Sequence, residues 1–299
     1  MQTQNSASLV GLFFLSLCIF ATIGIASQSG SMNSQNLYAE PVPVEQVEAK
    51  SIKELKSIFA ELDYTWPPND NFSTHIVTRY LPESFSNIKN SAEKKKLFVQ
   101  TLLPIAQLEN QRAAKHRRLG LFLLKDNQWP EDERLANIAK NIALYYRVKT
   151  DNATLARQLL AKRADQIPEQ LIIAQAAIES GWGSSRFALE GNSLFGQWSF
   201  EKGSGIVPAD RQDGLSHQVK AFEDLQDSVR SYMQNINTNR AYRELRDSRT
   251  EMRKNGQVLD AYKLAEGLQR YSQRGEAYVE ELQQLMRQPV FRAISLQDK

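Results

Sequence analysis

The sequence has almost none of the residues that usually cross-link a chain or bind a metal ion. Among its 299 residues there is one cysteine, Cys18, so a disulfide within the chain is excluded. The three histidines, His75, His116 and His217, lie far apart in the sequence and do not match the spacing of zinc ligands. The sequence therefore predicts no metal site and no cofactor, and it leaves stability to the hydrophobic core.

Several common functional patterns are also missing. There is no glycine-rich phosphate-binding loop, and Glu-Ser-Gly-Trp-Gly at residues 179–183 differs from the Gly-x-Ser-x-Gly of serine hydrolases. The net charge is only +3 and no basic face is concentrated in the sequence, which argues against nucleic acid as a partner. A content of 41% hydrophobic and 24% charged residues is typical of a globular protein with one or two domains.

The first 50 residues predict a membrane-directed segment and a linker. Residues 9–26 carry no charge and are mostly apolar, a length at the border between a signal peptide and a membrane anchor. Gly24-Ile25-Ala26 offers small residues where a signal peptidase cleaves, so we expect export with cleavage after Ala26. The absence of Lys and Arg from the first eight residues keeps an uncleaved anchor in the inner membrane as the alternative. Residues 27–50, rich in Ser, Gln, Asn and Pro, are interpreted as a flexible linker.

Residues 51–165 predict a series of helices without a chemical motif. Apolar residues recur at helical spacing over residues 51–62, 93–125 and 130–145, and again from about 151 to 163. Within the longest of these, Pro104 should kink or split the helix, and Gly120 marks a second plausible break. We interpret residues 51–165 as a helical segment packed on a catalytic core formed by residues 166–290.

The centre of the sequence is a buried helix that ends in a carboxylate. Pro168 suits the first helical position, and residues 171–178 are apolar on nearly every side, interrupted only by Gln175. Glu179 follows this run directly, and Gly181 or Gly183 should end the helix. Glu179 is therefore expected in the last turn of a core helix.

Three influences should raise the pKa of Glu179. The negative end of the helix dipole disfavours a second negative charge, apolar surroundings disfavour the ionised form, and Trp182 should exclude water. A carboxylic acid that stays protonated near neutral pH can protonate the leaving oxygen of a glycosidic bond. The competing interpretation is a solvated glutamate at a helix end.

The stretch AQAAIESGWGSSRFA, followed by GNSLFGQW, resembles the core motif of bacterial glucosaminidase domains. These peptidoglycan-cleaving enzymes form glycoside hydrolase family 73, and the similarity along the chain is of the Bax-like kind. The resemblance implies that Glu179 is the catalytic acid. It also implies that the Asn192–Gly196 element, with Asn192, Phe195 and Gly196, lies beside the cleft.

The resemblance implies a second acidic residue in a small β-lobe. Residues 200–222 carry glycines and short alternating stretches that predict a hairpin or meander, and its candidate acids are Asp210 and Asp213. Asp213 precedes Gly214, where turn formation is the alternative role. Tyr271 matches the first tyrosine of a family element near the catalytic centre, with core packing as its alternative. Aromatic residues proposed to stack on sugars, with core packing again the alternative, are Trp182, Phe195 and Trp198.

The resulting prediction is a mainly α (α+β) protein, a lysozyme-like helical domain with a small β-hairpin lobe. Further helices are expected over residues 222–236, 257–269 and 276–288, the last ended by Pro289. The implied reaction is hydrolysis of the β-1,4 bond after N-acetylglucosamine in peptidoglycan strands, in the periplasm or cell envelope. The alternatives are a lytic transglycosylase of the same fold, a non-catalytic wall-binding or scaffold protein, and a glycoprotein endoglycosidase.

Overall fold

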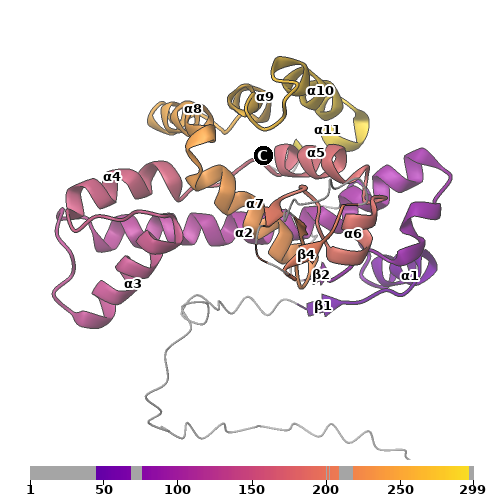
Figure 1. Ribbon diagram of the computed structural model, residues 1–299, viewed down its shortest axis with the longest axis horizontal. Coiled ribbons are helices and arrows are strands. Elements are labelled where there is room, and N and C mark those ends of the chain that lie inside the picture. Colours follow the sequence, from indigo (N-terminus) through magenta and orange to yellow (C-terminus); the bar gives the residue numbers. More distant parts are fainter. Residues whose placement is uncertain (1–44, 69–75, 200, 202, 209–217, 296–299) are drawn as a thin grey trace, which may run out of the picture. The chain divides into compact units, whose positions relative to one another are not determined.

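The computed structural model describes residues 45–68, 76–199, 201, 203–208 and 218–295. The predicted signal or anchor segment, residues 1–26, and both candidate acids of the β-lobe, Asp210 and Asp213, lie outside the described residues. The described part is mostly helical, with two small sheets (Figure 1). Within it, no helix is long and apolar enough to cross a membrane.

The helices and strands follow one another along the whole described chain. The α-helices are α1 (Ile52–Glu61), α2 (Ser91–Leu123), α3 (Glu133–Tyr145), α4 (Ala153–Arg163), α5 (Glu169–Ser180), α6 (Arg186–Gly191), α7 (Leu225–Thr238), α8 (Arg243–Lys254), α9 (Ala261–Ala265), α10 (Glu276–Met286) and α11 (Pro289–Ser295). Short 3-10 helices are η2 (Glu83–Asn87), η3 (Arg240–Tyr242) and η4 (Glu266–Leu268). The strands are β1 (Glu45–Val47), β2 (Ile76–Thr78), β3 (Trp198–Ser199), β4 (Gly205–Ile206) and β5 (Gln218–Lys220).

Polar side chains set where many helices begin. Asn90 caps α2 and Asn152 caps α4, each by accepting a hydrogen bond from the backbone N–H three residues later. Asp132 and Asp224 do the same for α3 and α7. These caps explain why α3 begins after Asp132 and not at the expected residue 130, and why α7 begins after Asp224 and not at residue 222.

The long helix α2 is unbroken, so the expectation that Pro104 or Gly120 splits it was wrong. Every residue from Leu97 to Ala106 is buried, and packing on all sides holds the helix through Pro104. At Gly120 a methyl group would lie 3.2 Å from Leu160 Cδ1. Gly120 therefore serves the close approach of α4 to α2 and does not end the helix.

Helix α5 lies at the centre of the core. It packs against α2, α9, α10 and α11, and α2 also packs against α7 (Figure 1). The Gln170 side chain donates to the carbonyl of Met286 at 3.0 Å, which ties α5 to the end of α10. Helix α5 is thus enclosed by segments that precede and follow it in the chain, as its apolar sequence predicts.

Two small sheets complete the fold. Strands β3, β5 and β4 form an antiparallel sheet in that order, with Trp198 opposite Val219 and Gly205 opposite Lys220. Strands β1 and β2 pair in parallel, and Ala49 just after β1 is only 7% exposed. Residues 45–50, at the end of the expected linker, thus contain strand β1 and the buried Ala49.

The C-terminal helices differ in detail from the expectation. Asp260 caps α9, so the helix expected over residues 257–269 is the shorter α9 followed by η4. Pro289 begins α11 after α10 has ended at Met286, and α6 and α8 were not anticipated. The predicted fold class, a mainly α protein of the lysozyme-like kind with a small β-lobe, is nevertheless confirmed.

Candidate active site

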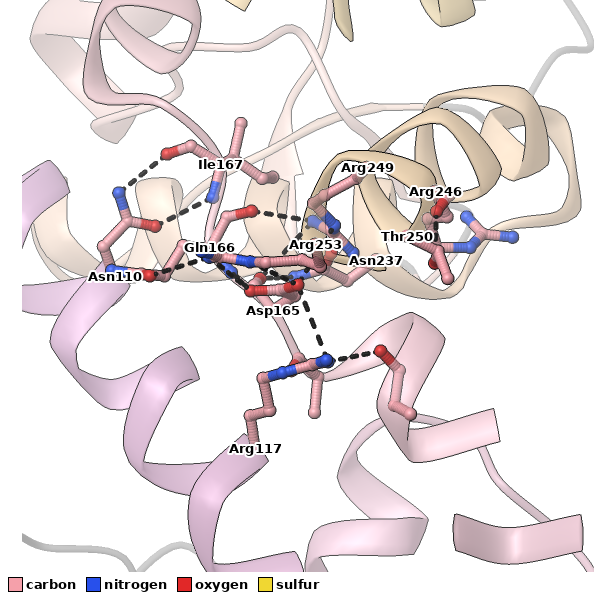
Figure 2. A network of polar contacts seen from close by, with 12 residues as sticks. Asn110, Arg117, Asp165, Gln166, Ile167, Asn237, Arg246, Arg249, Thr250 and Arg253 are labelled. Atoms are coloured by element: carbon pink, nitrogen blue, oxygen red, sulfur yellow. Dashed lines mark hydrogen bonds and ion pairs between the residues drawn. The ribbon is translucent and has the colours of Figure 1, made fainter. Parts of the chain in front are cut away.

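The entry to α5 is fixed by a buried polar network (Figure 2). The Asn110 amide donates to the Ile167 carbonyl at 2.7 Å and accepts from the Ile167 N–H at 3.0 Å. The Asn237 amide donates to the Asp165 carbonyl at 3.0 Å. Side chains of α2 and α7 thereby satisfy the backbone just before α5 and fix where that helix starts.

Asp165 is the charged centre of this network and is 2% exposed. Arg253 binds its carboxylate with two nitrogens, at 2.9 and 3.3 Å, while Arg117 and Arg249 lie at 3.5 and 3.8 Å (Figure 2). Burial alone would raise the pKa of Asp165, but Arg249, Arg253 and Arg117 outweigh burial and lower it. Asp165 is a structural anion held between α2, α8 and the start of α5.

The exit from α5 is a tight turn made by Gly181, Trp182 and Gly183, all with positive φ. Gly181 is the left-handed C-cap that the sequence predicted. Ser180 Oγ donates to the Ala176 carbonyl at 2.6 Å and accepts from the Gly183 N–H at 2.8 Å. A methyl group at Gly183 would lie 2.6 Å from Leu81 Cδ1, so this position lacks room as well as a permissible φ.

A cleft of about 610 Å³ opens beside the last turn of α5. Five of the nine predicted site residues line it, namely Glu179, Phe195, Gly196, Trp198 and Tyr271. The other lining residues are Arg147, Gln197, Lys220, Ser231, Gln234, Asn235 and Tyr242. Glu179 is the one carboxylate among the described residues that line this cleft.

A chain of buried hydrogen bonds supports Glu179 from the core side. The Tyr232 hydroxyl donates to Gln175 Oε1, and Gln175 Nε2 donates to the Tyr278 hydroxyl at 2.9 Å. The Tyr278 hydroxyl in turn hydrogen-bonds the Glu179 carboxyl group. Gln175, Tyr232 and Tyr278 are each 0% exposed, so this chain is shielded from water. The residue that interrupts the apolar run is therefore a support for the carboxyl group one turn later.

The pKa of Glu179 is raised above its usual value of 4.5, with burial as the largest cause. The hydrogen bond from Tyr278 and the charge of Arg274 oppose the shift, and the charge of Glu281 adds to it. The direction agrees with the sequence prediction. The Trp182 side chain is not the group that shields the Glu179 carboxyl from water, since it packs against Phe98 and Phe291.

Aromatic rings form the wall between the cleft and the core. The Phe195 ring stacks on Tyr232 at 4.0 Å, and Tyr271 stacks on Tyr278 at 5.6 Å between ring centroids. The Tyr271 hydroxyl donates to the Phe195 carbonyl at 3.2 Å. Phe195 is only 3% exposed whereas Trp198 is 55% exposed. Of these two rings, Trp198 is the one whose face is open to a bound sugar.

The structure places Trp182 and Asn192 away from this cleft. The Trp182 ring lies 5.8 Å from the rings of both Phe98 and Phe291, and its left-handed backbone turns the side chain toward them. The Asn192 side chain donates to the carbonyls of Phe222 and Glu223 at 3.1 and 3.2 Å. Both residues hold the turns that flank the cleft, so the prediction that they touch substrate is not supported by their positions.

Several lining residues were missed by the sequence analysis. Ser231, Gln234 and Asn235 lie on the polar side of α7, at the helical spacing i, i+3 and i+4. This polar stripe was visible in the sequence, but it resembles any solvated helix face. Arg147 and Lys220 come from separate turns and strands and carried no local signal. Among the described residues, no three histidine, aspartate or glutamate side chains cluster as metal ligands.

Part of the chain is similar to a known protein family and to a known protein. The sequence model of a family described as mannosyl-glycoprotein endo-beta-N-acetylglucosaminidase, a glucosaminidase domain, matches residues 154–289. Protein bax of Escherichia coli (strain K12) is 33% identical over 187 residues, which cover 62% of this chain. The chain is thus similar to Protein bax and contains a region that matches the glucosaminidase family. The matched region covers 66% of Protein bax, just under two thirds, and no solved structure matches the chain significantly.

The glucosaminidase domain contains most of the cleft. Residues 154–289 include Glu179, Trp198 and Tyr271 together with both supporting tyrosines, Tyr232 and Tyr278. Arg147 is a lining residue that lies before the matched region.

Proposed function

We propose that this protein hydrolyses the β-1,4 bond after N-acetylglucosamine in peptidoglycan, with Glu179 as the general acid. The observation that carries the proposal is the setting of Glu179. Its carboxyl group lies on the wall of a cleft of about 610 Å³, is hydrogen-bonded by Tyr278, and has a pKa raised by burial. Those are the properties required of a group that protonates a leaving oxygen near neutral pH.

The reaction begins with proton transfer from Glu179 to the glycosidic oxygen. Cleavage of the bond leaves positive charge on the sugar ring in an oxocarbenium-like transition state. The charge on Glu179 after transfer is stabilised by the Tyr278 hydroxyl, which is itself held by Gln175. The buried hydrogen-bond chain thus fixes the acid in position before and after it has lost its proton.

The positive charge on the sugar must be stabilised by a second group. One route uses a carboxylate of the β-lobe, for which Asp210 and Asp213 are the candidates from the sequence. The other uses the carbonyl oxygen of the substrate's own N-acetyl group. The described part of the cleft offers Glu179 as its one carboxylate, and both candidate acids lie outside the described residues, so the two routes are equally compatible with the structure. Tyr271, beside Phe195 and Gly196, is proposed to orient that N-acetyl group.

A lytic transglycosylase is the second candidate, because Glu179 on the cleft wall is the one acid that its reaction requires. Such an enzyme uses a single glutamate and releases an anhydro sugar in place of a reducing end. The two activities give products of different mass. A wall-binding protein without turnover is the third candidate, and it predicts binding but no release of fragments.

The decisive experiment is digestion of purified peptidoglycan by the wild-type protein and by Glu179→Gln, with the reduced products analysed by mass spectrometry. We expect the wild-type protein to release fragments that end in chemically reduced N-acetylglucosamine. The variant should release at least ~10²-fold less of them. Anhydro ends would reassign the protein to the transglycosylases. Equal release by the variant would contradict the assignment of Glu179.

We also propose export to the periplasm or cell envelope. The support is the uncharged residues 9–26 and the small residues before Ser27. N-terminal sequencing of protein recovered from cells tests this proposal. A chain that begins at Ser27 would indicate a cleaved signal, an intact chain in the membrane fraction would indicate an anchor, and an intact chain in the cytosol would contradict both.

A further inference from the structure

Two cations line the cleft together with Glu179. Arg147 lies between α3 and α4, and Lys220 lies on β5 in the β-lobe, so the two come from different walls. Within the described part of the chain, neither has an acidic side chain within ion-pair distance. By contrast, Arg230 pairs with Glu109 and Asp227, and Arg253 pairs with Asp165. The cleft therefore presents positive charge that the described residues leave unpaired.

The backbone at Arg147 is built to hold that residue in place. Its φ is 54°, in the left-handed region that an arginine rarely adopts and that costs about 1–2 kcal/mol. Arg163 donates to the carbonyls of Tyr146 and Arg147 at 3.2 and 2.7 Å, and Gln234 on α7 donates to the Tyr145 carbonyl at 2.9 Å. Three hydrogen bonds thus hold the left-handed turn that ends α3 against α7, the helix that lines the cleft.

Contacts within and beside the small sheet hold Lys220 in place. It pairs with Gly205 across the small sheet, and its N–H donates to the Gln197 carbonyl at 2.8 Å. Its ammonium group lies 5.0 Å from the centre of the Phe222 ring. The β-lobe therefore carries this cation as a fixed part of the cleft wall.

The two cations are distinct from the charges that shift the pKa of Glu179. The charges that move the pKa of Glu179 are those of Arg274 and Glu281, and neither Arg147 nor Lys220 is among its causes. A charge that lines a cleft but does not act on the catalytic group is available to a ligand. Among the ligands that could enter the cleft, an anionic one would compensate this charge.

We propose that Arg147 and Lys220 form an anion subsite that selects carboxylate-bearing glycans over neutral ones. This inference rests on the proposed function and specifies its substrate class. A neutral N-acetylglucosamine polymer has no anionic group that could bind these cations. A peptidoglycan strand carries carboxylates from two sources, the lactyl group of its second sugar and the peptide attached to that group.

The test is a binding measurement on the full chain carrying Glu179→Gln, so that no ligand is consumed. The three ligands are peptide-bearing peptidoglycan oligosaccharides, peptide-free oligosaccharides with a free lactyl carboxylate, and chitotetraose. Arg147→Gln and Lys220→Gln are each added to this parent. Arg147→Lys retains the charge, and Arg118→Gln removes an exposed arginine of α2 that does not line the cleft.

We expect Arg147→Gln and Lys220→Gln each to weaken binding of carboxylate-bearing ligands on the order of 5-fold, the range of a solvent-exposed charge pair. Binding of chitotetraose should stay within about 2-fold of the parent, and the weakening should shrink as salt is added. The charged ligand that loses affinity identifies which carboxylate is recognised. Arg147→Lys should restore most of the affinity, and Arg118→Gln should change none of the three.

Equal affinities of parent and both glutamine variants for every ligand would overturn the anion subsite. So would a loss that is the same for chitotetraose as for the charged ligands, because that result indicates a general packing defect. In either case the proposed hydrolase activity stands if wild-type protein still releases fragments in a Glu179-dependent way. A parent that binds none of the three ligands would overturn the subsite, while fragment release by the wild-type protein decides the proposed function separately.

Discussion

Two carboxylates lie at opposite ends of α5, and their surroundings shift their pKa values in opposite directions. Asp165, just before the helix, is 2% exposed and is surrounded by three arginines that lower its pKa. Glu179, in the last turn, is half-buried, has no ion-pair partner within the described residues, and has a raised pKa. One helix therefore connects a carboxylate that stays charged with one that is favoured in its protonated form.

The difference lies in what contacts each group. Arginines neutralise Asp165, so its charge holds three segments together and is not available for chemistry. Glu179 accepts a hydrogen bond from the neutral hydroxyl of Tyr278, which orients the group and favours its ionised form less than burial disfavours it. An ion pair fixes structure, whereas a neutral hydrogen bond in a partly dry site leaves the proton transferable. The variants below test that contrast.

Asp165→Asn should have the largest effect, because it leaves three arginines without their shared anion. We expect the free energy of unfolding to fall by about 3–5 kcal/mol, as when one partner of a buried ion pair is removed. Since the pKa of Asp165 is lowered on folding, its contribution exists above its unfolded pKa near 3.8 and disappears as pH falls through the folded value. Urea unfolding at several pH values measures both effects.

The matched control is Asp247→Asn, which removes an exposed aspartate paired with Lys162 at 2.9 Å. It should cost less than about 1 kcal/mol. If the two variants were equally stable, Asp165 would be no more than a surface charge and the contrast between the ends of α5 would be lost.

Tyr278→Phe should reduce kcat on the order of 10-fold, because Glu179 loses the hydroxyl that orients it. That hydroxyl also favours the ionised carboxylate, so its removal should raise the pKa of Glu179 and move the alkaline limb of the pH–rate profile to higher pH. Tyr64→Phe is the control, since it removes a buried hydroxyl that donates to the Gln100 carbonyl outside the cleft. A limb that moves to lower pH would show that Tyr278 does not stabilise the carboxylate.

Glu179→Gln should make the protein slightly more stable while it abolishes activity. The folded pKa of Glu179 is raised, so ionisation is easier in the unfolded chain and the charged form destabilises the fold as pH rises above 4.5. We expect the Tm to increase at pH 7 on the order of 1–3 °C, with no increase below pH 4.5. Calorimetry beside Glu190→Gln, an exposed glutamate on α6, measures this, and a decrease at pH 7 would contradict the raised pKa.

The smallest effects should come from the Arg274–Glu281 ion pair, which lies near Glu179 and is about half exposed. Arg274→Gln should raise the pKa of Glu179 and Glu281→Gln should lower it, each by less than about one pH unit because solvent screens these charges. The alkaline limbs of the two pH–rate profiles should therefore move in opposite directions. Movement in the same direction would show that the pair acts through structure and not through charge.

The sequence predicted those parts of the site that depend on local signals. The apolar run before Glu179 and the glycine after Ser180 define a buried helix and its end, and both are present in α5. The family motif added Phe195, Gly196, Trp198 and Tyr271, which line the same cleft. Their roles in catalysis stay predictions, as do those of Asp210 and Asp213.

Other features could not be predicted because they join distant segments. Gln175 and Tyr278 are separated by 103 residues, and nothing near either residue indicates the other. The continuity of α2 through Pro104 results from packing on all sides, which overrides the local preference of proline. The packing of Trp182 against Phe98 and Phe291 could not be predicted either, because both rings lie far from it in the sequence.

The enclosure of α5 also has a consequence for the order in which the chain becomes protected during synthesis. Helix α2 emerges from the ribosome before α5, but α10 and α11, which cover its other side, emerge last. Until then an apolar helix that ends in the proposed acid has no complete cover and is open to proteases and to other nascent chains. A stop codon before Glu276 would therefore leave a chain with every lining residue of the cleft but without a closed core.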